Sequence, residues 1–261
     1  MTIITKIPGV TFTDATLPKL YRDSVVTPGT KFCFDAADTY SYAQQANPVA
    51  GTDFWRDLTP NNANAGFSTG NTFGSGGFTF NPLAGQTINL PTSGKAPPDA
   101  SGFLTCVWFK YIAASAQAFS SIAGMCNSTA TNFNQYSIDS GAANSGALRL
   151  TVLGNTGLAV TPALNSINQI VAGCKKLANG TYDTYFWRNG VLINSVNSGG
   201  TSIAPSMTNT NPTIGQVTGF TGGSNFRAFR TFHDDATTLP DVAAMTALVL
   251  KDYNANVSRF S

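Results

Sequence analysis

The chain has 261 residues, of which 42% are hydrophobic, so it is long enough and apolar enough to bury a sizeable core in one large domain. Only 11% of the residues are charged, and the formal net charge of +2 comes without any long basic run, which argues against partners such as nucleic acid or an anionic membrane. Asn, Ser, Thr and Gly must therefore cover much of the surface. Such a composition suits extracellular or virion β-proteins better than a cytosolic metabolic enzyme.

Residues 1–29 are interrupted by prolines and glycines, with short apolar stretches between them. We interpret them as an extended docking arm, followed by one domain over residues 30–261. The candidate docking residues are Leu17, Leu20, Tyr21 and Arg22. Such an arm lies either over its own domain or on a partner chain. The first twenty residues contain no signal-peptide pattern, and no stretch approaches the ~18 apolar residues of a membrane span, so we expect a protein made in the cytoplasm that does not enter a membrane.

From Lys31 onward, short β-type runs alternate with turn clusters, a pattern typical of a jelly roll or sandwich. We predict an all-β fold made of two antiparallel sheets, with Asn61–Gly77 as a loop. The predicted strands are Lys31–Ala36, Phe78–Phe80, Thr87–Leu90, Gly102–Ile112, Ser120–Met125, Asn134–Ser140, Ala147–Leu153, Gly157–Val160, Gln169–Lys176, Tyr182–Arg188, Val191–Val196, Thr213–Gln216 and Asn225–Thr231.

One segment has helical spacing. Val242, Met245, Val249 and Tyr253 recur at three- and four-residue intervals, which predicts a helix over Pro240–Tyr253. We expect this helix to pack on the edge of the sheets.

Asn189-Gly190 lies between two β-type runs and predicts a hairpin with a type I′ turn. The expected pairs are Arg188 with Val191, Trp187 with Leu192, Phe186 with Ile193, and Tyr185 with Asn194. One face then carries Thr184, Phe186, Val191 and Ile193, and the other carries Tyr185, Trp187 and Leu192, so both faces are apolar. One face must be the core. The other must be covered by the protein's own chain, by a partner subunit, or by a saccharide stacked on Trp187, which makes Tyr185, Trp187 and Leu192 candidate contact residues.

Catalytic chemistry has few candidates in this sequence. All 13 acidic residues are Asp, and the nearest pairs for glycoside cleavage are Asp234 with Asp235 and Asp35 with Asp38. Asp234 and Asp235 lie at a turn, where Asp is common. His233 is the only histidine, and the sequence has no G-x-S-x-G motif that could supply the serine of a Ser-His-Asp site. We expect His233 to be a hydrogen-bonded surface or edge residue. We therefore predict no enzyme activity.

The sequence indicates no cofactor. The four cysteines, Cys33, Cys106, Cys126 and Cys174, lack zinc-ligand spacing and are expected to be buried thiols, with one or two disulfides as the alternative. A D-x-D-x-D-G calcium loop is also missing, so we predict no metal site, although lectin-like sandwiches sometimes hold calcium in their loops.

Several short motifs occur in a characteristic order: Phe34-Asp35-Ala36, Trp55–Leu58, Phe103–Lys110, Val171-Ala172-Gly173, Trp187–Val191, Thr213-Ile214-Gly215, Phe226–Phe232 and Leu239–Tyr253. Over residues 31–256 the chain resembles the laminin-G-like, concanavalin-A-like lectin/glucanase jelly rolls. It departs from them at Asn168-Gln169-Ile170, where that family often has Trp-His. It also lacks the glutamate pair of laminarinase-type members.

The segments Lys19–Asp23, Gly29–Phe32 and Phe34-Asp35 are similar to bacteriophage virion proteins with a lectin-like jelly roll. This resemblance implies a non-enzymatic structural protein on the virion surface. The arm would attach it to the major capsid or tail protein, and we expect a homo-oligomer. The first alternative is a glycan-binding adhesin that recognises a host surface polysaccharide; the second is a polysaccharide hydrolase.

Overall fold

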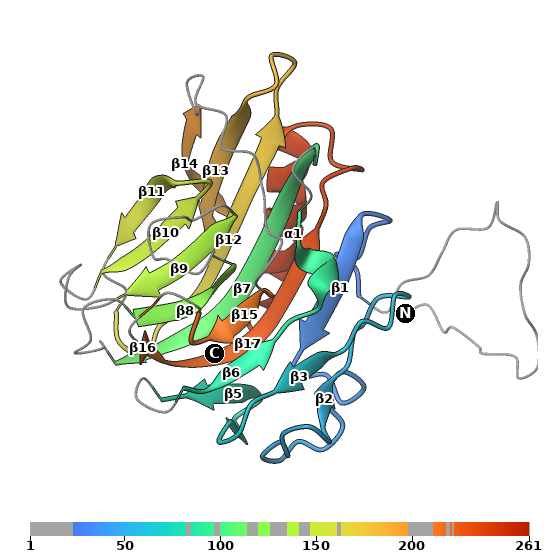
Figure 1. Ribbon diagram of the computed structural model, residues 1–261, viewed down its shortest axis with the longest axis vertical. Helices are drawn as coiled ribbons and strands as arrows, with labels where there is room; N and C mark the ends of the chain where they lie inside the picture. The colour runs from blue at the N-terminus through green and yellow to red at the C-terminus, as the bar shows by residue number, and fades with distance from the viewer. Residues whose placement is uncertain are drawn as a thin grey trace, which may run out of the picture.

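The computed structural model describes residues 23–81, 85–96, 100–113, 120–125, 135–140, 147–160, 163–197, 211–217, 220 and 222–260. Within them, strands form two packed sheets, and one α-helix lies close to the C-terminus (Figure 1). The predicted β-sandwich with a C-terminal helix is therefore confirmed. The proposed docking residues Leu17, Leu20, Tyr21 and Arg22 lie outside the described residues, as does Cys126.

The first sheet, sheet A, has the strand order β14-β13-β12-β7-β17-β5-β4, and β1 also pairs with β17. All its pairings are antiparallel. Its strands are β1 (Thr30–Asp35), β4 (Thr72–Gly74), β5 (Gly77–Phe80), β7 (Gly102–Ala113), β12 (Ile167–Lys176), β13 (Tyr182–Arg188), β14 (Val191–Asn197) and β17 (Asn225–Asp234).

The second sheet, sheet B, has the order β11-β10-β9-β8-β15-β6-β3-β2, with β16 pairing in parallel to β8. Its strands are β2 (Phe54–Trp55), β3 (Ala65–Phe67), β6 (Thr87–Asn89), β8 (Ser120–Met125), β9 (Tyr136–Ser140), β10 (Leu148–Val152), β11 (Asn155–Val160), β15 (Thr213–Gly215) and β16 (Gly222–Gly223). A short 3₁₀-helix, η1 (Thr92–Gly94), precedes β7.

The space between the sheets holds an aromatic core. The ring of Phe78 lies 4.8 Å from those of Tyr42 and Phe67 and 5.0 Å from that of Trp55. Aromatic pairs at such distances add to the stability that burial alone provides. Trp55 belongs to β2 and Phe67 to β3. Because β3 and β4 both lie within Asn61–Gly77, the prediction of a continuous loop there was wrong. Strands of two or three residues are too short to show alternation.

The predicted helix over Pro240–Tyr253 is present as α1 (Val242–Asn256), which begins two residues later and ends three residues later than predicted. The side chain of Asp241 caps it by accepting a hydrogen bond of 2.8 Å from the backbone N–H of Ala244. Met245 and Val249 are fully buried against the outer face of sheet A. The predicted position at a sheet edge was wrong, because α1 lies across one face of sheet A (Figure 1) and covers the apolar residues on it.

The β13–β14 hairpin turns at Asn189 and Gly190, whose φ angles of 50° and 79° fit the predicted type I′ turn. The predicted pairs of Arg188 with Val191 and Trp187 with Leu192 are confirmed. The next two predicted pairs were wrong: Phe186 pairs with Asn194 and Tyr185 with Ser195. A register shift skips Ile193, as a β-bulge does.

Candidate functional site

The three residues predicted as a saccharide or subunit contact lie under α1. Trp187 is fully buried, and its Nε1 donates a hydrogen bond of 3.0 Å to the hydroxyl of Thr246 on the helix. Tyr185 is also buried, its hydroxyl donates to Asp183, and burial raises the pKa of Tyr185 to about 12. Leu192 is partly buried against the same cluster. The protein's own chain thus covers this face, and Trp187 presents no open ring for a sugar.

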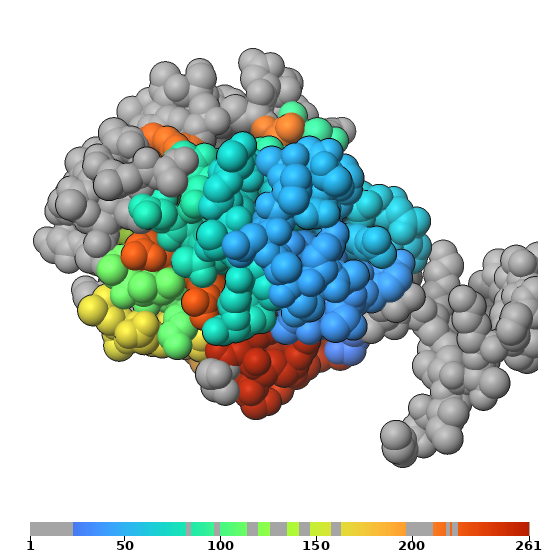
Figure 2. Space-filling view, turned by 90° about the horizontal axis from the view of Figure 1, so that it is seen from below, coloured from blue at the N-terminus to red at the C-terminus, as the bar shows by residue number. Residues whose placement is uncertain are grey.

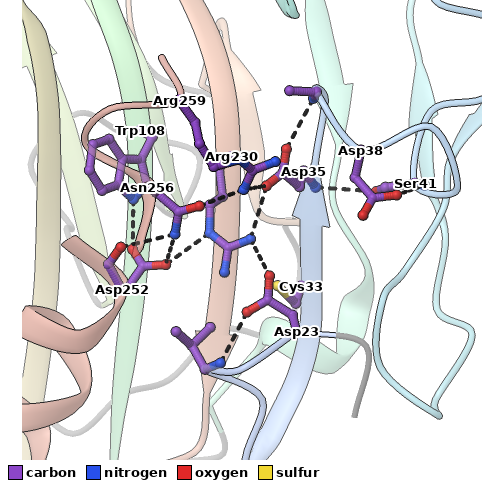
Figure 3. A network of polar contacts seen from close by, with 12 residues as sticks. Asp23, Cys33, Asp35, Asp38, Ser41, Trp108, Arg230, Asp252, Asn256 and Arg259 are labelled. Carbon is purple, nitrogen blue, oxygen red and sulfur yellow. Dashed lines mark hydrogen bonds and ion pairs between the residues drawn. The ribbon is translucent and has the colours of Figure 1, made fainter. Parts of the chain in front are cut away.

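A buried network of ionic groups lies on the same outer face, centred on Arg230 of β17. The Arg230 side chain has no exposed surface, and it reaches carboxylates from three parts of the chain (Figure 3). Nε is 2.9 Å from Asp252, and Nη1 is 2.7 Å from Asp23 and 3.2 Å from Asp35. We call these four residues, together with Asn256 and Arg259, the Arg230 network.

Asp252 joins α1 to the sheet. Its Oδ2 accepts hydrogen bonds of 2.6 Å from the indole N–H of Trp108 on β7 and 2.8 Å from the amide of Gln169 on β12. Its Oδ1 accepts from Arg230 and, at 3.0 Å, from Asn256 one helical turn later. A buried carboxylate with this many donors is satisfied, so removing it would leave several donors without partners.

Asp35 of β1 joins the network to the C-terminal turn. Its Oδ2 is 2.7 Å from Nη1 of Arg259, which also donates to the side-chain oxygen of Asn256. The following residue, Phe260, is buried, and its ring stacks on Phe229 at 5.0 Å. The residues after α1 are therefore fixed to the sheet by both charge and packing.

The anchor segment, which we define as residues 23–29, is held by the same network. Asp23 pairs with Arg230 and accepts a hydrogen bond of 3.0 Å from the backbone N–H of Val25. Val25 and Val26 are buried in the cluster under α1. Figure 2 shows the N-terminal segment in blue beside the C-terminal region in red. Residues that the sequence assigned to the arm thus pack as part of the sandwich from Asp23 onward.

Burial and charge set the ionisation of the network. Burial opposes the charge on Arg230, yet the nearby carboxylates outweigh it and raise the pKa of Arg230 further above its usual range. Burial likewise tends to raise the pKa of Asp23, but Arg230 outweighs it and the pKa lies below its ordinary value. Burial also raises the pKa of the free thiols of Cys33 and Cys106 beside the network, so neither is a reactive thiolate.

The predicted acid pairs serve as structural acceptors. Asp234 is buried and accepts a hydrogen bond of 3.0 Å from the hydroxyl of Thr30. Asp235 pairs with Lys31 at 2.5 Å. Asp38 accepts from backbone N–H groups of the turn that follows it. Among the residues that the structure describes, no group of three His, Cys or Asp side chains could hold a metal ion, and no helix is long and apolar enough to cross a membrane.

His233 is not the surface or edge residue that we expected. It is 2% exposed, and its Nδ1 lies 2.7 Å from the hydroxyl of Thr105. Burial lowers the pKa of His233 to about 3, although Asp235 opposes the shift, so the ring is neutral at physiological pH. The reason is that β17 continues to Asp234, beyond the predicted end at Thr231.

The Arg230 network was not predicted from the sequence. One signal was present: Asp252 and Asn256 follow Met245 and Val249 at helical spacing, which places a carboxylate and an amide on the apolar stripe of α1. A second was Arg230 within the otherwise apolar strand β17. Buried charges of this kind need partners, but the sequence does not reveal which ones.

No protein-family model and no curated protein matches the sequence. Among solved structures, the fold is similar to a sialidase of Trypanosoma rangeli (TM-score 0.58, 12% identity, covering 87% of this chain and 33% of that one). It is also similar to the binding domain of Paraclostridial Mosquitocidal Protein 1 (0.55, 15%, 87% and 52%) and to the botulinum neurotoxin serotype D binding domain (0.56, 8%, 88% and 52%). The chain thus spans a third to a half of these structures.

At such low identities the likeness concerns the fold alone. It agrees with the predicted two-sheet β-sandwich.

Proposed function

We propose that this protein is a non-enzymatic binding module of a bacteriophage particle, attached to its head or tail through the N-terminal arm. The proposal depends on the way the anchor segment is attached to the sandwich. Asp23, Val25 and Val26 are fixed to the sandwich by an ion pair and by burial, directly after the predicted docking residues. A partner that holds the arm would thereby hold a rigid domain. The phage assignment itself depends on the sequence resemblance.

Such anchoring suits a protein that is held on a particle and bears load, and it is not needed for catalysis. Arg230 links the anchor segment to α1 through Asp252, so any load on the arm reaches the sheet through buried ion pairs. Contacts of modest area are sufficient when many copies repeat on a symmetric particle. Two of the similar structures are described as binding domains, which also supports a non-enzymatic role.

Deletion of residues 1–22 tests attachment without disturbing the anchor segment. We expect the truncated protein to keep the melting temperature of the full chain and to lose incorporation into particles, measured by co-sedimentation. A triple substitution of Leu17, Leu20 and Tyr21 by Ser should give the same loss, whereas Lys19→Ser is the matched control. Normal incorporation of the truncated protein would refute attachment through the arm.

A glycan-binding module is the second candidate. It is favoured by a cavity of about 190 Å³ at one end of the sandwich, lined by lysine, hydroxyl and aspartate side chains. A sialidase among the similar structures is in complex with 2,3-difluorosialic acid, which shows only that a protein containing such a fold handles sugars. Incubation of the pure protein with a polysaccharide panel separates binding from hydrolysis, because a binding module retains the chain without shortening it.

A further inference from the structure

The cavity lies where the ends of three strands of sheet A meet residues 93–96 and 100–101, which precede β7. Lys31 of β1, Gly102 at the start of β7 and His233 near the end of β17 all contribute to its lining. Its volume of about 190 Å³ is below the roughly 300–1,000 Å³ of sites for drug-sized ligands, so it is suited to one small ring. Ala96, Ala100 and Gly102 contribute only small side chains or none to the lining, which leaves the space open.

His233 is one of the residues that line this cavity. Its ring lies 5.7 Å from that of Phe32 and 6.0 Å from that of Phe103, and both ring pairs are stacked. Nδ1 is engaged with Thr105, while Nε2 has no hydrogen-bond partner among the described residues. A side chain 98% buried thus carries a free polar atom beside a cavity that it lines.

The rim provides both charges and hydroxyl groups. Lys31 and Asp235 form an ion pair of 2.5 Å, and Asp235 is held further by the hydroxyl of Thr237. Lys95 is partly exposed and pairs with no carboxylate among the described residues. Ser93 and Ser101 add two exposed hydroxyls. Among the described residues, the titratable groups that line the cavity are two lysines, one aspartate and a neutral histidine, which together carry one net positive charge.

We propose that this cavity binds a single carboxylated sugar ring, such as a hexuronate unit of an acidic polysaccharide, with its carboxylate at Lys95. The proposal deepens the glycan-binding candidate and depends on it, but not on attachment through the arm. Sugar hydroxyls both donate and accept, and the Lys31–Asp235 pair offers both partners side by side. Sulfate fits less well, because Asp235 would repel it and it has no hydroxyl group to donate to that carboxylate.

The single histidine makes the site directly observable by NMR. The ring protons of His233 give the only imidazole signals of the chain. Titration of the full chain with sodium glucuronate at pH 7 should shift these signals, whereas glucose should shift them at much higher concentrations only. Unchanged signals at saturating glucuronate would overturn the proposal. Equal shifts with sodium sulfate would show an adventitious ion only and would also overturn it.

Lys95→Gln removes the charge from the rim. We expect its affinity for glucuronate to fall about tenfold or more, since hydrogen bonds to charged groups are the stronger ones. Lys110→Gln is the matched control, because Lys110 lies eight residues along β7 from Gly102, about 26 Å away at the usual strand rise. Both variants should retain the wild-type melting temperature.

Glycan binding by the protein and binding of the sugar in this cavity can be tested separately. If polysaccharides bind the protein but Lys95→Gln and Lys110→Gln bind glucuronate alike, the cavity assignment is wrong and glycan binding remains. If no saccharide binds at all, both are wrong, and the deletion of residues 1–22 still decides attachment separately. A second variant, Ser93→Trp, should block the cavity by volume and abolish the shift of the His233 signals.

Discussion

Sheet A has two apolar faces that are built differently. The inner face meets sheet B through aromatic and aliphatic side chains, with Phe78 among four neighbouring rings. The outer face combines apolar residues such as Trp108 and Trp187 with the Arg230 network, and α1 and the anchor segment cover it. Apolar packing tolerates many partners, whereas a buried ion pair requires specific ones. The outer face therefore specifies which segments of the chain lie on it.

The largest effect is expected from Arg230→Met. Met fills similar space but leaves the carboxylates of Asp23, Asp35 and Asp252 without their common partner. We expect the free energy of unfolding to fall by about 3–5 kcal/mol, as for other broken buried ion pairs. Urea denaturation of the full chain measures it.

The control is Arg227→Met on the same strand. Arg227 is partly exposed and donates to the hydroxyl of Thr79, so its loss should cost less than about 1 kcal/mol. Equal costs for the two variants would mean that the Arg230 network adds no more than a surface contact.

The pH dependence of stability separates the two faces. His233 on the inner side has a pKa of about 3 when folded and about 6.5 when unfolded, so the unfolded chain binds the proton first. Stability should fall as the pH drops below about 6.5, by up to ~1.4 kcal/mol per pH unit. Asp23 on the outer side has a lowered pKa, so its contribution is lost only below about pH 4.

Two variants test which residue causes the loss of stability in each pH range. His233→Gln retains a partner for Thr105 and should remove the decline between about pH 6.5 and 4. Asp23→Asn should leave that decline unchanged and reduce the loss below about pH 4. Thermal melting across pH 3–8 records both. A decline that persists in His233→Gln would show that another group titrates in this window.

A smaller effect is expected at the helix cap. Asp241→Ala removes the hydrogen bond to the N–H of Ala244 and should cost about 1 kcal/mol. Asp241→Asn is the matched control, since Asn caps equally well. Hydrogen exchange should accelerate in α1 and leave β8 and β9 of sheet B unchanged. Uniform acceleration would indicate that the helix and the sandwich unfold as one unit.

The sequence predicted elements whose information is local. Strands β7, β12 and β13 were found because they are long and apolar, and the hairpin because Asn189-Gly190 sets its turn. The short strands β2, β3 and β4 were missed, because their pairing is decided by the core around Phe78. The Arg230 network could not be predicted, since Asp23 and Arg230 lie 207 residues apart. The cavity likewise depends on segments that only the fold brings together.

The smallest expected effect concerns the exposed side of the β13–β14 hairpin. Val191 and Ile193 are 58% and 48% exposed, although the sequence placed them on one face with buried Phe186. Val191→Thr and Ile193→Thr should therefore change the free energy of unfolding by no more than about 0.5 kcal/mol. Leu192→Ala, at the partly buried position between them, should cost more. Because β14 is the edge of sheet A, a larger loss in the threonine variants would show that another copy buries this edge in solution, and sedimentation velocity would then reveal a dimer that the variants lack.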